Sequence, residues 1–283
     1  MQIHRLTPQN SAFPDRLRHI PQPPKELFAR GNLKLLEQAS LAVVGSRAVT
    51  NYGKQVTQAL VKAVAGSIVI VSGLALGLDS VAHRAALDAE GPTIAVLPGG
   101  IERIYPATHY FLAQHIIKQG GLLLSEYGGE QRPQKQHFIA RNRIIAGLAD
   151  AVLIPEAAEH SGSLHTANFA LEQGKDILTV PGDIFRTTTA GSNNLIKTGA
   201  IPITDPQDLF DYFGIDRPPP VPLKGDTPHE QLLISLLQRE PLTGPALLAA
   251  SKLSIQTFNQ TLTLLEVKGI AQLVQGVTWT LIT

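Results

Sequence analysis

Six short apolar runs recur through the central part of the chain, each followed by glycine or a short polar segment. They begin at Leu41, Ile68, Thr93, Leu122, Ala151 and Ile177. Successive starts lie 25 to 29 residues apart, which is the length of a strand and a crossover helix. Because the runs are apolar throughout, both faces of each strand are expected to be buried. The pattern predicts an α/β domain over residues 40–213, with a Rossmann-like, mostly parallel sheet and helices on both faces.

The segments that flank this domain differ from it in pattern. Residues 1–39 are rich in proline and predict an irregular lead-in segment with one short helix near Leu33–Ala39. Residues 214–226 include the sequence Arg-Pro-Pro-Pro-Val-Pro at Arg217–Pro222. Such a run can form neither a helix nor a central strand, so it predicts a stiff linker.

The last segment, residues 227–283, combines helical and strand patterns. Three short helices are predicted at His229–Gln238, Thr243–Ala250 and Ile255–Val267. A hairpin of Ile270–Val274 and Val277–Ile282 follows, with its turn at Gln275–Gly276. Three helices and a hairpin in so short a segment predict a small winged-helix domain.

The composition is that of an ordinary globular protein. The 283 residues are 43% hydrophobic and 17% charged, with a formal net charge of +1. The absence of cysteine excludes disulfides, thiolate zinc sites and cysteine nucleophiles. The first residues contain no signal-peptide core, and no stretch reaches the roughly 18 apolar residues of a membrane span. We therefore expect a cytoplasmic protein that does not contact a membrane.

Glycine and small polar residues follow five of the predicted strands. These loops are Gly45–Thr50, Ser72–Gly77, Pro98–Gly100, Ser161–Ser163 and Pro181–Asp183. The carboxyl ends of parallel strands meet at one edge of a sheet, where ligands bind. Glycine permits close approach of the backbone, and helix amino termini present free N–H groups to an anion. The loops predict a phosphate-binding edge, although none matches a dinucleotide fingerprint or a Walker loop.

Two stretches carry cations and no acid. Residues 131–147 contain Arg132, Lys135, Arg141 and Arg143, and residues 184–204 contain Arg186 and Lys197. Bare basic stretches of this kind are usually solvated surface. They would indicate a nucleic-acid surface if the fold brought them together.

The sequence contains no recognisable catalytic or metal-binding pattern. The chain has no zinc-protease motif and no hydrolase elbow, and His160 and His165 are five residues apart, off the spacing of a helical metal pair. Asp79 and His83 have that i,i+4 spacing. A catalytic dyad is one interpretation, but an amino-terminal cap by Asp79 and packing by His83 are favoured. The sequence predicts no enzyme activity, metal or cofactor.

Five blocks of sequence occur in a distinctive order. They are Val43–Arg47 (VVGSR), Ser72–His83 (SGLALGLDSVAH), Phe138–Leu148 (FIARNRIIAGL), Ser161–Ala167 (SGSLHTA) and Gly191–Ala200 (GSNNLIKTGA). In this order they resemble the blocks of the DNA-processing protein A (DprA/Smf) family. The lead-in segment Pro23–Asn32 (PPKELFARGN) is also similar, so the resemblance spans about residues 14–212.

The resemblance implies a Rossmann-like homodimer that binds single-stranded DNA without sequence specificity and without catalytic turnover. It also implies protection of incoming strands in natural transformation and loading of the RecA recombinase onto them. The contacts carried over from the family are Ser46, Arg47, Arg141, Asn142, Arg143 and Lys175, with Gly73, Gly162, Ser163 and Asn193 lining the same groove. Phe138, beside the basic block, would stack on a base or anchor the following helix in the core.

Two other functions remain open from the sequence. A related class of nucleotide phosphoribohydrolases carries P-G-G-x-G-T-x-x-E, but here the loop Pro98–Pro106 lacks the G-T pair and Glu102 is displaced. A duplex-binding regulator would read bases with the helix Ile255–Val267. That helix has Gln256, Asn259 and Gln260 but no arginine, and Lys268 lies at its end. The pattern therefore favours an accessory or protein-interaction role for the winged-helix domain.

Overall fold

The computed structural model describes residues 2–217, 223–274 and 276–281. The chain divides into two compact units, Met1–Arg217 and Pro218–Thr283. Five residues of the predicted linker, 218–222, lie outside the described residues. Among the helices that the structure describes, none is long and apolar enough to cross a bilayer.

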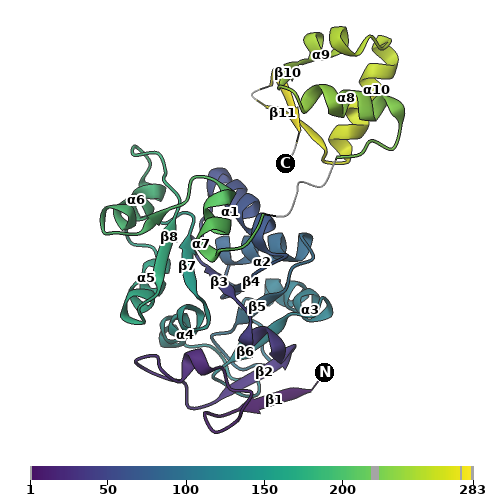
Figure 1. Ribbon diagram of the computed structural model, residues 1–283. Helices are drawn as coiled ribbons and strands as arrows, with labels where there is room; N and C mark the ends of the chain where they lie inside the picture. Colours follow the sequence, from purple (N-terminus) through teal and green to yellow (C-terminus); the bar gives the residue numbers. More distant parts are fainter. Residues whose placement is uncertain (1, 218–222, 275, 282–283) are drawn as a thin grey trace. The chain divides into compact units, whose positions relative to one another are not determined.

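In the described part of the first unit, one sheet of nine strands forms the centre (Figure 1). Its strand order is β1-β2-β6-β5-β4-β3-β7-β8-β9. The strands are β1 Ile3–Leu6, β2 Leu27–Gly31, β3 Ser40–Val43, β4 Val69–Ser72, β5 Thr93–Val96, β6 Leu122–Ser125, β7 Ala151–Ile154, β8 Asp176–Thr179 and β9 Ile201–Pro202. All pairings from β6 to β9 are parallel. The prediction of a mostly parallel sheet is confirmed.

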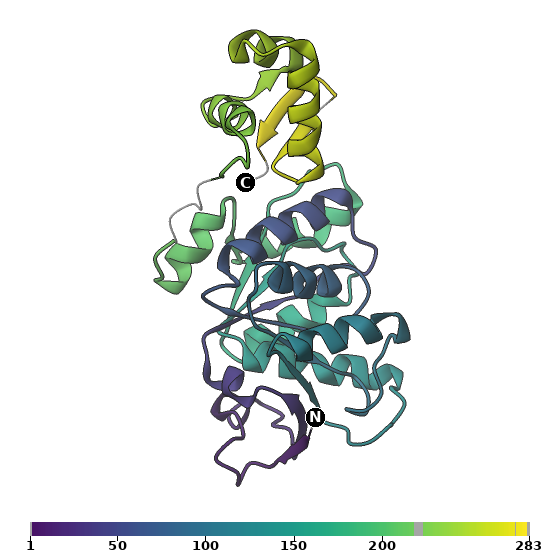
Figure 2. The same cartoon turned by 90° about the vertical axis from the view of Figure 1, so that its right-hand side faces the viewer.

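Helices cover both faces of this sheet (Figures 1 and 2). They are α1 Asn51–Val64, α2 Leu78–Asp88, α3 Tyr110–Lys118, α4 Lys135–Leu148, α5 Ser163–Glu172, α6 Ala190–Lys197 and α7 Pro206–Phe213. Alternate residues of one strand enter opposite cores. In β3, Ala42 packs with residues of α4 and α5, whereas Leu41 and Val43 pack with residues of α1, α2 and α7. Burial on both faces is the reason that the strands read as continuous apolar runs.

The lead-in segment is part of the sheet, so the expectation of an irregular segment was wrong. Strand β1 pairs with β2 and β2 pairs with β6, both antiparallel. Figure 2 shows these strands in purple at one end of the first unit. The side chains of Phe13 and Leu17 are buried in the core. Pairing with β6 satisfies backbone groups that β6 would otherwise expose at the sheet edge. The short helix predicted near residue 33 is a 3₁₀ helix, η2 Leu33–Glu37.

Strand β3 is the point at which the order of the strands across the sheet changes direction. From β3 the chain moves outward through β4, β5 and β6, and then returns to place β7 on the other side of β3. The loops that leave β3 and β7 therefore diverge, and a crevice opens between them at the carboxyl ends of the strands. This point positions the candidate site.

The second unit contains the predicted helices and hairpin strands. They are α8 Pro228–Leu237, α9 Gly244–Ser251, α10 Ile255–Val267, β11 Ala271–Val274 and β12 Thr278–Leu281. A short strand that was not predicted, β10 Leu242–Thr243, pairs with β12. Thr227, Thr243 and Ser254 cap the three helices by accepting backbone N–H bonds. Gln275 of the predicted turn lies outside the described residues, and the winged-helix assignment stays a prediction.

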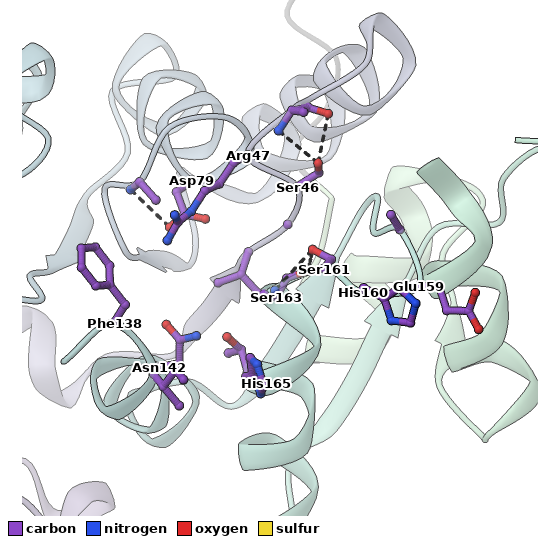
Figure 3. Close-up of a pocket in the computed structure, with 18 of the residues that line it drawn as sticks. Ser46, Arg47, Asp79, Phe138, Asn142, Glu159, His160, Ser161, Ser163 and His165 are labelled. Carbon is purple, nitrogen blue, oxygen red and sulfur yellow. Dashed lines mark hydrogen bonds between the residues drawn. The ribbon is translucent and has the colours of Figure 1, made fainter. Parts of the chain in front are cut away.

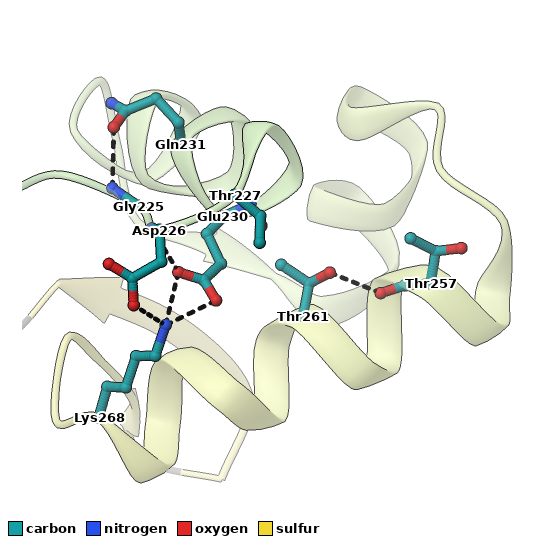
Figure 4. Close-up of polar contacts among 8 residues, drawn as sticks. All are labelled: Gly225, Asp226, Thr227, Glu230, Gln231, Thr257, Thr261 and Lys268. Carbon is teal, nitrogen blue, oxygen red and sulfur yellow. Dashed lines mark hydrogen bonds and ion pairs between the residues drawn. The ribbon is translucent and has the colours of Figure 1, made fainter.

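A buried carboxylate ties the start of the second unit to its third helix (Figure 4). Glu230 of α8 is 2% exposed, and its two oxygens accept bonds from Lys268 Nζ at 2.7 and 2.8 Å. Lys268 Nζ also donates to Asp226 Oδ2 at 2.7 Å. The hydrogen bond to Asp226, followed by that to Glu230, raises the pKa of Lys268. The cation at the end of α10 is thus engaged within its own unit.

We expect Lys268→Met to lower the melting temperature of the second unit, because the substitution leaves the Glu230 carboxylate buried without its cation. Trp279 of β12 is the only tryptophan in the chain, so its fluorescence reports the unfolding of this unit in the full-length protein. The raised pKa means that the stabilisation is complete below the ordinary lysine pKa and is lost as pH rises through the raised value.

Lys224→Met is the control, since Lys224 is exposed. A melting temperature that falls equally in both variants would contradict the assigned role of the Lys268 cluster.

Candidate functional site

A pocket of about 650 Å³ opens at the carboxyl ends of β3 and β7 (Figure 3). Its walls come from the loop after β3, the start of α2, one side of α4, and the loop from β7 into α5. The lining residues include Ser46, Arg47, Asp79, Phe138, Arg141, Asn142, Ser161, Gly162, Ser163, Thr187 and Ala190. Blocks that are far apart in the sequence therefore meet in one cavity. The prediction that strand-end loops converge is confirmed for those after β3, β4 and β7.

Glu156 joins the two diverging loops below the pocket. Its backbone oxygen accepts a bond from Ser46 N at 3.2 Å. Its fully buried carboxylate accepts bonds from the backbone N–H and the hydroxyl of Thr50, at 3.3 and 3.0 Å. Thr50 caps α1, so the carboxylate lies at the positive end of that helix. These bonds fix the loop that carries Ser46 and Arg47.

Arg47 is the exposed cation of the pocket. Its guanidinium carbon lies 5.5 Å from the centre of the Phe138 ring, a cation–π distance. The Phe138 ring is partly exposed and meets Tyr105 edge to face, with ring centroids 5.4 Å apart. Phe138 is therefore at the surface of the pocket and not in the core, which answers the alternative left open by the sequence.

Arg141 forms part of the floor of the pocket and is 5% exposed. One terminal nitrogen donates to the carbonyl oxygens of Gly73 and Val96. Asp79, also buried, accepts bonds from the backbone N–H groups of Gly73 and Ala75. Burial lowers the pKa of Arg141 to about 10, although the nearby Asp79 raises it. Burial raises the pKa of Asp79, against the opposing charge of Arg141.

The Asp79–His83 pair is not a dyad. Asp79 binds the loop before α2 as described, and is not itself the helix cap. His83 is fully buried, and its Nδ1 lies 2.7 Å from Thr93 Oγ1. Burial, followed by the charges of His109 and Arg141, lowers the pKa of His83 to about 3. A neutral, buried histidine of this kind serves packing, as the sequence favoured.

The outer wall of the pocket is polar. Ser161 and Ser163 hydroxyls lie 2.7 Å apart at the start of α5, and His160 and His165 line the same side. Within residues 2–217, 223–274 and 276–281, no group of three or more histidine, aspartate or glutamate side chains could hold a metal ion. The loop Pro98–Pro106, which a phosphoribohydrolase would use, supplies none of the described lining residues.

Four predicted site residues lie elsewhere. Gly73 is beneath the floor, against Arg141. Asn193 does not line the pocket. Its side-chain oxygen accepts a hydrogen bond from Gly182 N, and its side-chain nitrogen donates one to Gly182 O, both at 3.0 Å. Arg143 is 9% exposed, pairs with Glu126 just after β6, and does not line the pocket. Lys175 directly precedes β8, so it lies at the amino ends of the strands, where it lines a separate hollow with Arg16 and His19.

Some lining residues were missed by sequence reasoning. Thr187 and Ala190 reach the pocket from the segment after β8, where the motif had drawn attention to Asn193. The acid-free stretch from residue 184 was the available signal.

Comparison with known proteins identifies the family. The family model for DNA recombination-mediator protein A matches residues 4–214, which is well over half of the chain. The chain belongs to the DprA/Smf family. The DNA processing protein DprA of Bacillus subtilis (strain 168) is 43% identical over 211 residues, covering 74% of this chain and 71% of that protein. Protein Smf of Escherichia coli (strain K12) is 43% identical over 223 residues, covering 77% and 60%.

Solved structures of DprA/Smf proteins have the same fold as the first unit. The X-ray structure of DprA from Streptococcus pneumoniae aligns with a TM-score of 0.71 and 40% identity, over 75% of this chain and 74% of that chain. DprA from Helicobacter pylori, whose structure concerns its single-stranded DNA binding mode, aligns with a TM-score of 0.68 and 35% identity, over 75% and 96%. The identity and coverage support a DNA-processing role for this family member.

We expect Gly73→Ala to destabilise the first unit by about 1–3 kcal/mol, the cost of overpacking. A Cβ atom at residue 73 would overlap the Arg141 guanidinium and displace a buried charge from its carbonyl partners. Gly162→Ala is the control, because a Cβ there meets open space in the same pocket. Urea unfolding followed by far-UV circular dichroism measures both variants. Equal stability of the two would show that Arg141 moves aside without cost.

Proposed function

We propose that this protein binds single-stranded DNA without sequence specificity in the pocket at the carboxyl ends of β3 and β7. The observation that carries the proposal is the exposed Arg47 guanidinium over the partly exposed Phe138 ring. A cation for phosphate and an aromatic face for a base stand side by side. This is the combination that single-strand binding proteins use.

The surroundings of this pair suit a flexible, charged backbone. Gly162 and Ser163 at the start of α5 line the same cavity, and backbone N–H groups at a helix start favour phosphate oxygens. Ser161 and Ser163 add hydroxyl donors on the outer wall. Lys135, the exposed first residue of α4, is a further cation three residues from Phe138. None of these groups requires a particular base.

The same geometry favours a single strand over a duplex. Stacking on Phe138 needs the open face of an unpaired base, and a duplex hides those faces within its own stack. The cavity is concave and is lined from several loops. A groove of this kind accommodates several nucleotides, which accounts for glycine and serine in more than one loop.

The further properties inferred from the family belong to this proposal as well. We infer that the protein protects the bound strand, acts as a homodimer in the cytoplasm, helps to load the RecA recombinase and performs no catalytic turnover. The winged-helix domain is inferred to be accessory. The H. pylori relative, described for its single-stranded DNA binding mode, supports the DNA-binding part of the proposal.

We expect Arg47→Ala to weaken single-strand binding by about tenfold or more and to reduce the salt slope of log K by about one, as loss of one phosphate contact does. Fluorescence anisotropy with a labelled oligothymidylate, titrated across salt, measures both quantities. The wild-type protein should prefer the single strand to its duplex. An equal affinity of the wild type and Arg47→Ala for the single strand would contradict the assignment of the site.

Two variants serve as controls. Arg84→Ala removes an exposed arginine from α2, outside the pocket lining. Lys175→Ala removes the cation at the opposite edge of the sheet. Both should bind the single strand as the wild type does. A loss in Lys175→Ala equal to that in Arg47→Ala would move the site away from the pocket.

A further inference from the structure

Aromatic side chains continue beyond the pocket, from its rim toward α3. Phe138 lines the pocket, and Tyr105, which contacts it edge to face, is half-exposed outside the lining residues. Five residues further along the chain, Tyr110 and Phe111 begin α3. Their rings also meet edge to face, with centroids 5.7 Å apart. Three exposed rings thus follow the one in the pocket.

The core does not require the pair on α3. Phe111 is 82% exposed and Tyr110 51%, whereas the next residue of the helix, Leu112, is buried. The pair is nevertheless held on a rigid frame, because the preceding His109 is buried and its Nδ1 bonds to the carbonyl oxygen of Leu74 at 2.8 Å. Large aromatic groups fixed in solvent are typical of a binding surface.

The pair also lies close to Tyr105. A fully extended chain of five residues spans at most about 17 Å. Here the turn η3 Ala107–His109 shortens that span, since a 3₁₀ helix rises only about 2 Å per residue. Phe138, Tyr105 and the pair therefore lie within reach of one short strand.

Cations outnumber acids, three to two, on the loops beside these rings. Backbone bonds from Gly100 N to Gln131 O and from Glu102 N to Gly129 O place the loop before Tyr105 beside the loop before α4. The ionisable side chains on these two loops and at the start of α4 include Arg103, Arg132, Lys135, Glu102 and Glu130. Within the part of the chain that the structure describes, none of the three cations forms an ion pair.

We propose that Tyr105, Tyr110 and Phe111 form a second stacking surface, which holds further nucleotides of the same single strand after it leaves the pocket over Phe138. The inference rests on the proposed function of the pocket. Rings stack on any base, so the surface would extend the footprint without adding sequence preference. A long strand gains these contacts, and a strand that only fills the pocket does not.

The test compares oligothymidylates of about 6 and about 20 nucleotides by fluorescence anisotropy, lengths that bracket typical single-strand site sizes. The variant is Tyr110→Ala/Phe111→Ala in the full chain. Phe185→Ala is the matched control, because Phe185 is 91% exposed and lies two residues before Thr187, on another wall of the pocket. We expect the double variant to lose about tenfold in affinity for the long strand and nothing for the short one.

Each other outcome is informative. Unchanged affinity of the double variant for the long strand overturns the inference, as does an equal loss for both lengths. A selective loss of long-strand affinity in Phe185→Ala overturns it too, because the strand would then leave by the other wall. If the wild type binds neither strand, the proposed function of the pocket fails and the inference fails with it. Equal melting temperatures of wild type and variants exclude unfolding as the cause.

Discussion

The pocket depends on one buried guanidinium. Arg141 reaches from α4 to carbonyl oxygens at Gly73, just after β4, and at Val96 in β5. A buried charge is tolerated only when it is hydrogen-bonded and compensated, and the nearby Asp79 supplies the opposite charge while binding the same loop. This interaction fixes a helix and two strand ends relative to one another. The absence of a side chain at residue 73 is what lets the guanidinium approach the backbone.

Arg141 and Arg143 of the acid-free stretch therefore have a different role from Arg47. Arg141 and Arg143 are both buried and engaged with protein groups, and Arg141 shapes the pocket from its floor. Arg47 stands in solvent on a loop that Glu156 fixes. Only an exposed cation can exchange its hydration and counterions for a phosphate. The division explains how a chain with a net charge of +1 can carry the local nucleic-acid site that we propose.

Much of the architecture was predictable because it depends on local patterns. Continuous apolar runs at strand-plus-helix spacing indicated the parallel sheet, and the pattern of residues 227–283 indicated the three helices of the second unit. The lead-in strands were not predictable in this way. Strand β2 is stabilised by pairing with β6, some ninety residues away, and its own sequence, LFARG, has no period that distinguishes a strand from a loop. Tertiary pairing decided that segment.

The sequence by itself determined the fold class and the edge of the sheet where the pocket opens, since both follow from the order of apolar runs and glycine-containing loops. The family followed from the resemblance of five ordered sequence blocks. The tertiary structure decided which side chains reach that edge. It brought Arg47 onto Phe138, buried Arg141 and Arg143, and left Lys175 at the opposite end of β8. The physical reason is that a motif fixes residue type and spacing, whereas exposure and direction depend on what packs against the residue from distant parts of the chain.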